Sequence, residues 1–294
     1  MLTPALVWAE LEVEAAVAGK RLARRWKRAV KRSVTAPDSL ALTAEALGIE
    51  APPSGALARI ADGLSPADHN WFRAAPVMLT PDRDQLVLQP LDQPLSTDDA
   101  DALAGAARTH FGGSLALERG RSGRWYAAFE DVCDVAGVPP DEMTGRPLGI
   151  VSFGGGPDAS RLRAFLTELQ MLWYEHPVNL ARREAGLREA NALWLWGGGA
   201  LPEKPVLDEP ARLHADSPEL IGLASWLGLE FAPLDEPAPG EPRSRDLTVI
   251  DGEAGALGET WLGAFAALRG EFRLYTKGSE WRIPPRRGLF RLRG

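Results

Sequence analysis

The chain has 294 residues, of which 45% are hydrophobic and 25% are charged, a composition typical of a globular protein. This length suffices for one large domain or two smaller ones that bury most of their apolar surface. The net charge of −7 argues against a protein that binds nucleic acid with its whole surface, and no run of 18 apolar residues predicts a membrane span.

The N-terminal segment has acidic residues where a signal peptide would be basic and then apolar, namely Glu10, Glu12 and Glu14. We therefore expect a cytoplasmic protein. Cys133 is the single cysteine, which excludes an internal disulfide and a thiolate-based metal site within one chain.

Residues 1–65 read as a helical N-terminal segment. The pattern predicts one long helix or two over 5–32, then shorter helices over 39–49 and 55–64. Two prolines and a glycine interrupt it at 51–55 and predict a loop there.

A basic helix is predicted at residues 20–32, because Leu22, Trp26 and Val30 recur at helical spacing among eight cations. The cations are Lys20, Arg21, Arg24, Arg25, Lys27, Arg28, Lys31 and Arg32. The preferred interpretation is a solvated helix held by Trp26. The alternative is contact with an acidic partner, nucleic acid or a membrane surface; nucleic acid is the less favoured partner, and no membrane association is predicted.

Residues 66–205 alternate between strand and helix patterns. Strands are predicted at 71–80, 85–91, 114–120, 124–130, 147–153 and 190–196, and helices at 96–111 and 159–176. Ser96 and the acidic residues after it suit the start of the first helix. This interleaving predicts an α/β fold, with a layered mixed sheet and helices packed on it.

Residues 206–294 continue the pattern as a C-terminal α/β segment, expected to pack on the same core. It contains a predicted helix at 219–229, a Pro-rich loop at 232–245, a strand at 246–251, a helix at 258–270 and a closing hairpin at 271–285. The expected organisation is therefore three segments: 1–65, 66–205 and 206–294.

Neither glycine-rich stretch matches a nucleotide-binding fingerprint. Gly154, Gly155 and Gly156 lack the spacing of a dinucleotide site and the Gly-Lys-Ser/Thr ending of a P-loop. Their backbone N–H groups could bind an anion ahead of the next helix. The preferred alternative is a helix start capped by Asp158 or Ser160.

Metal and nucleophile motifs are missing from the sequence. There is no HxH, HExxH or G-x-S-x-G, and the four histidines are His69, His110, His176 and His214. His176 precedes Pro177 at a helix end, where an imidazolium could bind the last carbonyl groups.

Four motifs in one stretch resemble the archaeal-type cofactor-independent phosphoglycerate mutases of the alkaline-phosphatase-like superfamily. They are His176-Pro177-Val178-Asn179, Arg182-Arg183, Glu189-Ala190-Asn191 and the strand Leu193 to Gly199. A second patch, WFRAAPVMLTPDRDQLVLQ followed by LSTDDADAL, is similar too, and Arg124-Trp125-Tyr126 stands where the family has an arginine-bearing strand. The resemblance covers about 70–205 and corresponds to the substrate-cap part of those enzymes. LTELQMLWYEHPVN and NALWLWGGG also resemble proteobacterial proteins labelled phosphoglycerate mutase or pathogenicity-factor regulator.

The sequence departs from the family at the metal core. The family's N-terminal Asp and Ser or Thr nucleophile, and its C-terminal Asp-His pair, bind two metal ions and accept the phosphoryl group. Here the first 65 residues contain no histidine, none follows His214, and Trp196 replaces the family's arginine before Gly-x-Gly. The resemblance therefore implies a cap-like region without the metal core, so we predict no catalytic residue, metal ligand or cofactor.

Anion recognition is the chemistry that remains, because guanidinium groups donate paired hydrogen bonds to phosphate and carboxylate. The candidates for a small acidic ligand are Arg73, Arg124, His176, Asn179, Arg182, Arg183 and Asn191. Asn191 could instead bond to a strand end, and Arg182 and Arg183 could be solvated helix residues.

Three functional hypotheses follow. The first is a non-catalytic regulatory protein that binds a small phosphorylated or carboxylated metabolite or a protein partner. The second is a phosphoglycerate mutase or phosphotransferase with an unconventional metal site. The third is a nucleic-acid or scaffold protein that uses residues 20–32. The sequence does not predict an oligomeric state.

Overall fold

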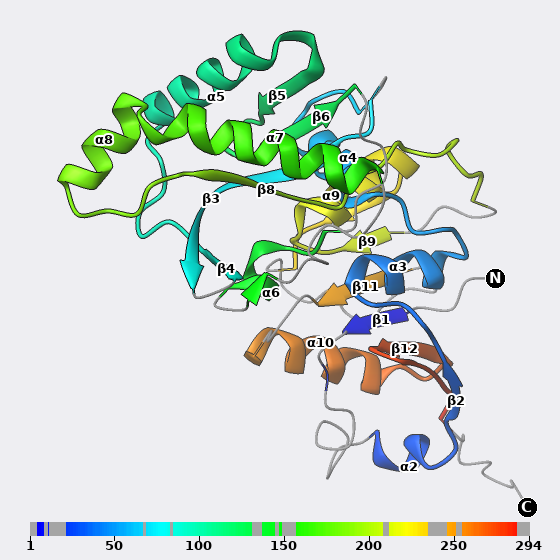
Figure 1. Ribbon diagram of the computed structural model, residues 1–294. Coiled ribbons are helices and arrows are strands. Elements are labelled where there is room, and N and C mark those ends of the chain that lie inside the picture. The colour runs from blue at the N-terminus through cyan, green and yellow to red at the C-terminus, as the bar shows by residue number, and fades with distance from the viewer. Residues whose placement is uncertain are drawn as a thin grey trace, which may run out of the picture. The chain divides into compact units, whose positions relative to one another are not determined.

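The computed structural model describes residues 5–8, 11, 22–66, 69–82, 85–130, 137–144, 147–148, 157–207, 212–234, 246–250 and 255–286. The chain divides into two compact units, one made of residues 1–51 and 203–294 and the other of residues 52–202 (Figure 1). In the ranges just given, no helix is long and apolar enough to cross a membrane. Gly154–Gly156 and part of the strand predicted at 147–153 lie outside the described residues.

The first unit is built on a mixed sheet of seven strands in the order β10-β9-β11-β1-β12-β13-β2. These strands are β1 (Ala5–Trp8), β2 (Val30–Ser33), β9 (Arg212–His214), β10 (Glu230–Ala232), β11 (Asp246–Ile250), β12 (Phe272–Thr276) and β13 (Ser279–Ile283). The five strands from β10 to β12 run parallel, whereas β13 pairs antiparallel with both β12 and β2. Strands β1 and β11 are buried along their whole length, as expected for the middle of a sheet covered on both faces.

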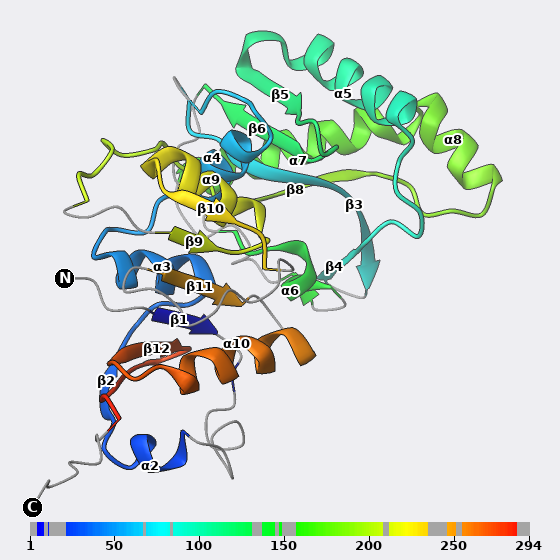
Figure 2. The ribbon, with the colours of Figure 1, turned by 180° about the vertical axis from the view of Figure 1, so that it is seen from behind.

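Among the residues that the structure describes, the helices of this unit are α2 (Ala23–Trp26), α3 (Ser39–Leu47), α9 (Pro218–Leu227) and α10 (Gly255–Ala267). Helix α3 lies against β1, β11 and β12. Trp261, Leu262 and Phe265 of α10 pack with Leu6 and Trp8 of β1 in one core cluster. The sheet lies between helices in both views of the molecule (Figures 1 and 2).

The N-terminal expectation is wrong in two places. Residues 5–8 form β1 and residues 30–33 form the edge strand β2, where a helix was expected. A short apolar run is ambiguous between helix and strand, and pairing with both β11 and β12 decides it for β1. Val30 is 66% exposed, so the apolar stripe through Leu22 and Trp26 does not reach it.

The basic segment is bound to its own unit through several of its cations. Arg25 is buried and donates to the carbonyl oxygens of Leu268 (2.7 Å) and Pro284 (2.8 Å). Arg28 donates to the carbonyl oxygen of Pro285, and Trp26 packs against Trp281 with 4.4 Å between ring centroids. The predicted role of Trp26 in holding this segment is therefore confirmed, although the helix ends at that residue.

The second unit contains a six-stranded sheet in the order β5-β6-β3-β4-β7, with β8 paired to β3. Its strands are β3 (Phe72–Asp82), β4 (Gln85–Gln89), β5 (Leu115–Arg119), β6 (Trp125–Phe129), β7 (Pro147–Leu148) and β8 (Ala192–Trp196). All these pairs are antiparallel. The long strand β3 organises the sheet, because its first half lies between β6 and β8 and its second half pairs with β4.

Helices cover this sheet on both faces. The unit contains α4 (Ser54–Ala61), α5 (Thr97–Phe111), the 3-10 turn η1 (Gly112–Ser114), α6 (Pro140–Met143), α7 (Pro157–Tyr174) and α8 (Pro177–Glu184). Side chains alternate along β6: Trp125, Ala127 and Phe129 join the core beneath α5 and α7, whereas Tyr126 and Ala128 pack with α4. Figure 2 shows α5, α7 and α8 gathered on one side of β3 and β8.

The predicted α/β fold is confirmed, and the strands and helices expected after residue 70 agree with the described ones to within a few residues. The division of the chain differs from the expected one. Residues 1–51 join residues 203–294 in one unit with its own core, so the C-terminal segment does not share the core of 66–205. The reason is topological: β1 is the central parallel strand on which the C-terminal strands assemble.

A candidate anion-binding cavity and its supporting motif

A cavity of about 550 Å³ opens in the second unit, between the start of β3, the first turn of α5 and the β5–β6 hairpin. Three arginines line it, Arg73, Arg119 and Arg124, together with the indole rings of Trp125 and Trp196. The structure thus brings together two of the residues proposed from the sequence, Arg73 and Arg124, and adds Arg119.

Arg124 is held in place by a buried carboxylate. Its Nη1 donates to Oδ1 of Asp62 at 3.0 Å, and Asp62 is 5% exposed. Oδ2 of Asp62 accepts from Ser122 Oγ and from the Tyr126 hydroxyl, both at 2.7 Å. Asp62, which follows α4, and the two groups that bond it therefore hold the Arg124 side chain on the cavity lining, a preorganisation that lowers the entropic cost of binding.

Tyr126 acts as a neutral hydrogen-bond donor in this cluster. Burial, followed by the hydrogen bond to Asp62, raises the pKa of Tyr126 well above its ordinary value. The phenol therefore keeps its proton at physiological pH, and this one proton is shared between Asp62 and the carbonyl oxygen of Ala58, which lies 2.9 Å from the hydroxyl oxygen.

Arg119 stands at the end of β5, directly opposite Trp125 in the strand register. Its Nη1 donates to Asp101 Oδ1 at 2.6 Å and to the carbonyl oxygen of Thr97 at 3.1 Å, which ties it to the first turn of α5. Its Nε is buried and has no hydrogen-bond partner among the residues that the structure describes. A buried donor of this kind gains from an acceptor, so Arg119 adds donor capacity to the cavity wall.

Arg73 lies on β3, with its guanidinium carbon 5.0 Å from the centroid of the Trp196 ring. The two residues face each other in the β3–β8 register. Stacking on an indole face orients the planar guanidinium. Trp196, which replaces an arginine of the resembled family, therefore forms a wall of the cavity next to an arginine.

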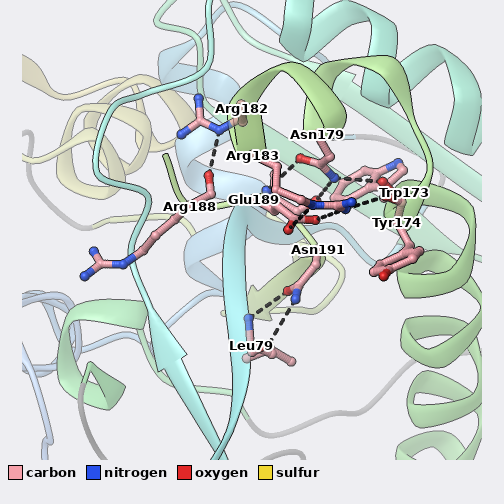
Figure 3. Close-up of polar contacts among 10 residues, drawn as sticks. Leu79, Trp173, Tyr174, Asn179, Arg182, Arg183, Arg188, Glu189 and Asn191 are labelled. Atoms are coloured by element: carbon pink, nitrogen blue, oxygen red, sulfur yellow. Dashed lines mark hydrogen bonds and ion pairs between the residues drawn. The ribbon is translucent and has the colours of Figure 1, made fainter. Parts of the chain in front are cut away.

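The remaining predicted residues lie elsewhere, around α8 and the chain leading to β8, where they bind the protein's own backbone (Figure 3). Asn179 is fully buried; its amide donates to the carbonyl oxygens of Trp173 (2.8 Å) and Ala190 (3.0 Å), and its Oδ1 accepts from the Ala190 N–H. Asn191 bonds the backbone N–H and carbonyl of Leu79 at 2.7 and 2.9 Å, which extends the β3–β8 ladder. Asn191 therefore makes the strand-end hydrogen bonds that the sequence allowed as the alternative to a ligand contact.

His176 caps the start of α8, whereas the sequence also allowed an imidazolium that binds the last carbonyl groups of the preceding helix. Its Nδ1 accepts from the Val178 N–H at 3.3 Å, which requires an unprotonated nitrogen. Burial lowers the pKa of His176 below its ordinary value, and the charge of Asp99 only partly opposes this effect. A neutral ring is therefore favoured at the start of α8.

Arg182 and Arg183 differ in environment. Arg183 is exposed and forms a two-pronged ion pair with Glu189 at 2.8 Å for each prong (Figure 3). Arg182 is buried rather than solvated; its Nε donates to the carbonyl oxygen of Arg188 at 2.7 Å and its Nη2 to that of Gln93 at 2.9 Å.

The contact with Gln93 connects this motif to the cavity. The loop that contains Gln93 also contributes Leu91, Pro94 and Leu95 to the cavity wall. Arg188 binds the same loop through Asp92, at 2.7 Å between Nη1 and Oδ1. Arg182 and Arg188 therefore hold the loop that forms one wall of the cavity.

The glycines after β8 serve close packing. The Gly55 N–H donates to the carbonyl oxygen of Gly197 at 2.8 Å, which brings the start of α4 against the end of β8. A Cβ atom would overlap Ser54 at Gly197 and the Phe72 ring at Gly198, and Gly197 has a φ of +61°. These positions require glycine for contact with the protein itself.

In the described ranges, no three His, Cys, Asp or Glu side chains lie close enough together to hold a metal ion.

The geometry defines an α/β protein with an arginine-lined cavity, and comparison with known proteins adds a family relationship. No family model matches the chain. A 2,3-bisphosphoglycerate-independent phosphoglycerate mutase from Methanothrix thermoacetophila is 34% identical over 99 residues, which is 33% of this chain and 25% of that protein. A second such mutase, from Methanothermobacter thermautotrophicus, is 28% identical over 91 residues, 31% of this chain and 23% of the relative. The matched segments thus span about a quarter of the length of these curated relatives.

A solved structure of a protein from Pyrococcus horikoshii aligns with a TM-score of 0.53 at 14% identity, covering 97% of this chain and 87% of that one. The cofactor-independent phosphoglycerate mutase from Thermoplasma acidophilum aligns with a TM-score of 0.48 at 15% identity, over 96% of this chain and 89% of that one, a similarity too low to establish a common fold by itself. This chain is related, over part of its length, to the cofactor-independent phosphoglycerate mutases.

The sequence contains a signal for Arg119 that sequence reasoning missed. Arg119 and Arg124 flank the predicted hairpin turn, and hairpin pairing places both residues at one end of the sheet, with Arg119 opposite Trp125. Thr97, by contrast, could not be predicted as a cavity residue from the local sequence, because the start of α5 reaches the cavity only through tertiary packing.

Proposed function

We propose that this protein is a non-catalytic binding protein that recognises a small phosphorylated or carboxylated ligand in the arginine-lined cavity and acts in regulation. The single observation that carries the proposal is the convergence of Arg73, Arg119 and Arg124 on one cavity of about 550 Å³. That volume lies within the ordinary range for small-molecule sites.

The charges around the cavity support an anionic ligand. Asp62 and Asp101 partly offset Arg124 and Arg119, and both arginines keep further N–H donors beyond these contacts. Arg73 adds a third guanidinium, stacked on Trp196. The partial relatives bear the name phosphoglycerate mutase, so phosphoglycerates are the first ligands to test.

The absence of catalysis is proposed from the sequence. The chain has four histidines, none before His69 and none after His214. A centre that holds two metal ions with imidazole and carboxylate ligands would have few histidines to use.

The test is calorimetric titration of the full chain with 3-phosphoglycerate, 2-phosphoglycerate and glycerate, each with and without Mn²⁺. We expect metal-independent binding of a phosphorylated compound, at least about ten-fold weaker in Arg73→Ala because a charge-assisted hydrogen bond is lost. Arg163→Ala is the matched control, since Arg163 is an exposed cation on α7 that bonds Ser160 and does not line the cavity. Equal loss in both variants, or no binding of any of these anions, would contradict the proposal.

A second candidate, a phosphoglycerate mutase or phosphotransferase, is favoured by the names of the partial relatives. Conversion of 3- to 2-phosphoglycerate by the purified chain, dependent on Mn²⁺ or Zn²⁺, would establish it in place of the first.

The third candidate, a nucleic-acid or scaffold function of residues 20–32, has less physical support. Arg25 and Arg28 bond backbone carbonyls, and Arg32 bonds the carboxylates of Glu45 and Glu280. Fewer cations remain for phosphate contacts than the sequence suggests. A steep loss of nucleic-acid binding with added salt would favour this function.

A further inference from the structure

A second cavity, of about 370 Å³, lies at the other end of α5. The arginine-lined cavity reaches Thr97 and Ala100 in the first turns of α5, whereas this one reaches Phe111, the last residue of the helix. It is lined by Phe111, Ser114, Phe129, Glu130, Arg161, Ala164, Phe165 and Glu168. We call it the phenylalanine cavity.

Three phenyl rings form its wall. The Phe165 centroid lies 4.5 Å from that of Phe111 and 4.8 Å from that of Phe129, the second pair edge to face. Phe111 and Phe165 are only half-buried, so part of their ring surface faces the cavity. The face of a phenyl ring carries negative partial charge and attracts cations within about 6 Å of its centroid.

Carboxylates around these rings add further negative charge to the cavity. Glu130 and Glu168 are exposed carboxylates on the lining, and Glu130 has no ion-pair partner among the described residues. Glu168 Oε1 lies 2.6 Å from His110 Nε2. Arg161, the one guanidinium among the described residues of the lining, donates to Asp158 Oδ1 at 3.2 Å. Two carboxylates and three rings therefore face one cation whose charge is partly offset by Asp158.

We propose that the phenylalanine cavity binds an organic ammonium ion with a short apolar body, independently of the anion-binding function proposed above. The rings contact the methylene or methyl groups and the positive charge, and Glu130 supplies the counter-charge. The ligand is a free amine or the side chain of a lysine on another protein, since both present the same group.

The probe for a free amine is choline, and its control is 3,3-dimethylbutan-1-ol, which has the same shape without the charge. Titration of the full chain, followed by calorimetry at constant ionic strength, should give saturable binding of choline and at least about five-fold weaker binding of the neutral alcohol. Equal binding of the two would overturn the proposal, because the cavity would then recognise apolar shape alone.

Two variants test the residues. Phe165→Leu keeps apolar volume but removes the ring, and we expect about five-fold weaker choline binding. Glu130→Gln removes an exposed carboxylate, leaves the core untouched, and should weaken binding while the melting temperature is unchanged. Glu184→Gln, an exposed acidic position on α8 outside the cavity, is the matched control. If Glu184→Gln weakened binding as much as Glu130→Gln, a general charge effect would replace the site.

A peptide containing one trimethyl-lysine, compared with its acetyl-lysine counterpart, distinguishes the source. Tighter binding of the trimethyl peptide than of choline identifies a protein side chain as the ligand, and tighter binding of choline identifies a free amine. Failure of both to bind above their neutral counterparts would overturn the proposal.

Discussion

Asn179 shows how a residue that reads as a ligand contact can be a structural one. Its carboxamide bonds two carbonyl groups and one N–H of the chain between α7 and β8, and of these the Trp173 carbonyl also accepts from the His176 N–H. A buried polar group that loses its partner costs the full desolvation of that group. The conformation of the chain between α7 and β8 therefore depends on the Asn179 side chain, whether or not a ligand contacts it.

We expect Asn179→Ala to lower the free energy of unfolding by about 2–3 kcal/mol, because three buried hydrogen bonds to the backbone are lost. Affinity for the anionic ligand, measured on the fraction that remains folded, should stay close to that of the unmodified protein. Arg183→Ala is the comparison, since its exposed ion pair with Glu189 contributes far less. If Asn179→Ala abolished ligand binding while its urea unfolding midpoint was unchanged, Asn179 would have to be a ligand contact.

His176 makes stability depend on pH in a defined direction. Burial lowers its pKa in the folded state, so the unfolded chain binds a proton more readily than the folded chain does. The contribution of this residue is therefore fully retained above the ordinary histidine pKa of about 6.5 and is lost as the pH falls below it.

The variant His176→Asn keeps an N-cap acceptor and removes the titrating group. Urea unfolding at about pH 7 and about pH 5.5 should show a smaller loss of stability for this variant than for the unmodified protein. Identical losses in the two proteins would show that His176 is protonated equally in the folded and unfolded states.

At the level of elements, the junction between β8 and α4 explains why glycines follow β8 at residues 197–199. The hydrogen bond from Gly55 to Gly197 brings two backbones into contact, and a Cβ at Gly55 would overlap the carbonyl oxygen of Trp71. Because the obstacle is backbone, it cannot move aside as a flexible side chain would.

We expect Gly55→Ala to destabilise the second unit by at least about 2 kcal/mol, the cost of forcing a methyl group into a packed contact. Gly105→Ala provides the opposite case. Gly105 lies inside α5 with open space around a Cβ, so alanine should stabilise the helix by about 0.5–1 kcal/mol. Thermal unfolding of both variants measures the difference, and a neutral Gly55→Ala would mean that the two backbones are not in contact in solution.

At the level of the whole molecule, the two units have separate cores and differ in how the chain contributes to them. Residues 52–202 are continuous, whereas the other unit needs both ends of the chain, since β1 pairs with β11 and β12. A continuous segment of this size with its own core has the properties of an independently folding domain.

A fragment containing residues 52–202 should therefore fold alone and bind the same anionic ligand as the full chain, with affinity within about three-fold. Circular dichroism measures the folding and calorimetric titration the binding. A fragment that folds but does not bind would place the ligand outside the arginine-lined cavity. Residues 203–294 without the N-terminal segment should fail to fold, because their sheet lacks its central strand β1.

The sequence by itself determined most elements after residue 70, because their apolar periodicity is long and their turns are marked by Gly, Pro and Asp. The relationship to the mutases over part of the chain is also a property of the sequence. Local patterning could not decide the identity of β1 and β2, since a four-residue apolar run and a basic edge suit either structure until strand pairing selects one.

Only the tertiary structure decided which polar side chains keep hydrogen-bonding capacity for a ligand. His176, Asn179, Arg182 and Asn191 satisfy backbone groups that folding would otherwise leave unpaired, and this use depends on loops distant in sequence, such as the one at Gln93. Arg73, Arg119 and Arg124 converge because β3 and the β5–β6 hairpin are neighbours in one sheet. Residue type shows what a side chain can bind, whereas the packing around it determines whether that capacity is already used.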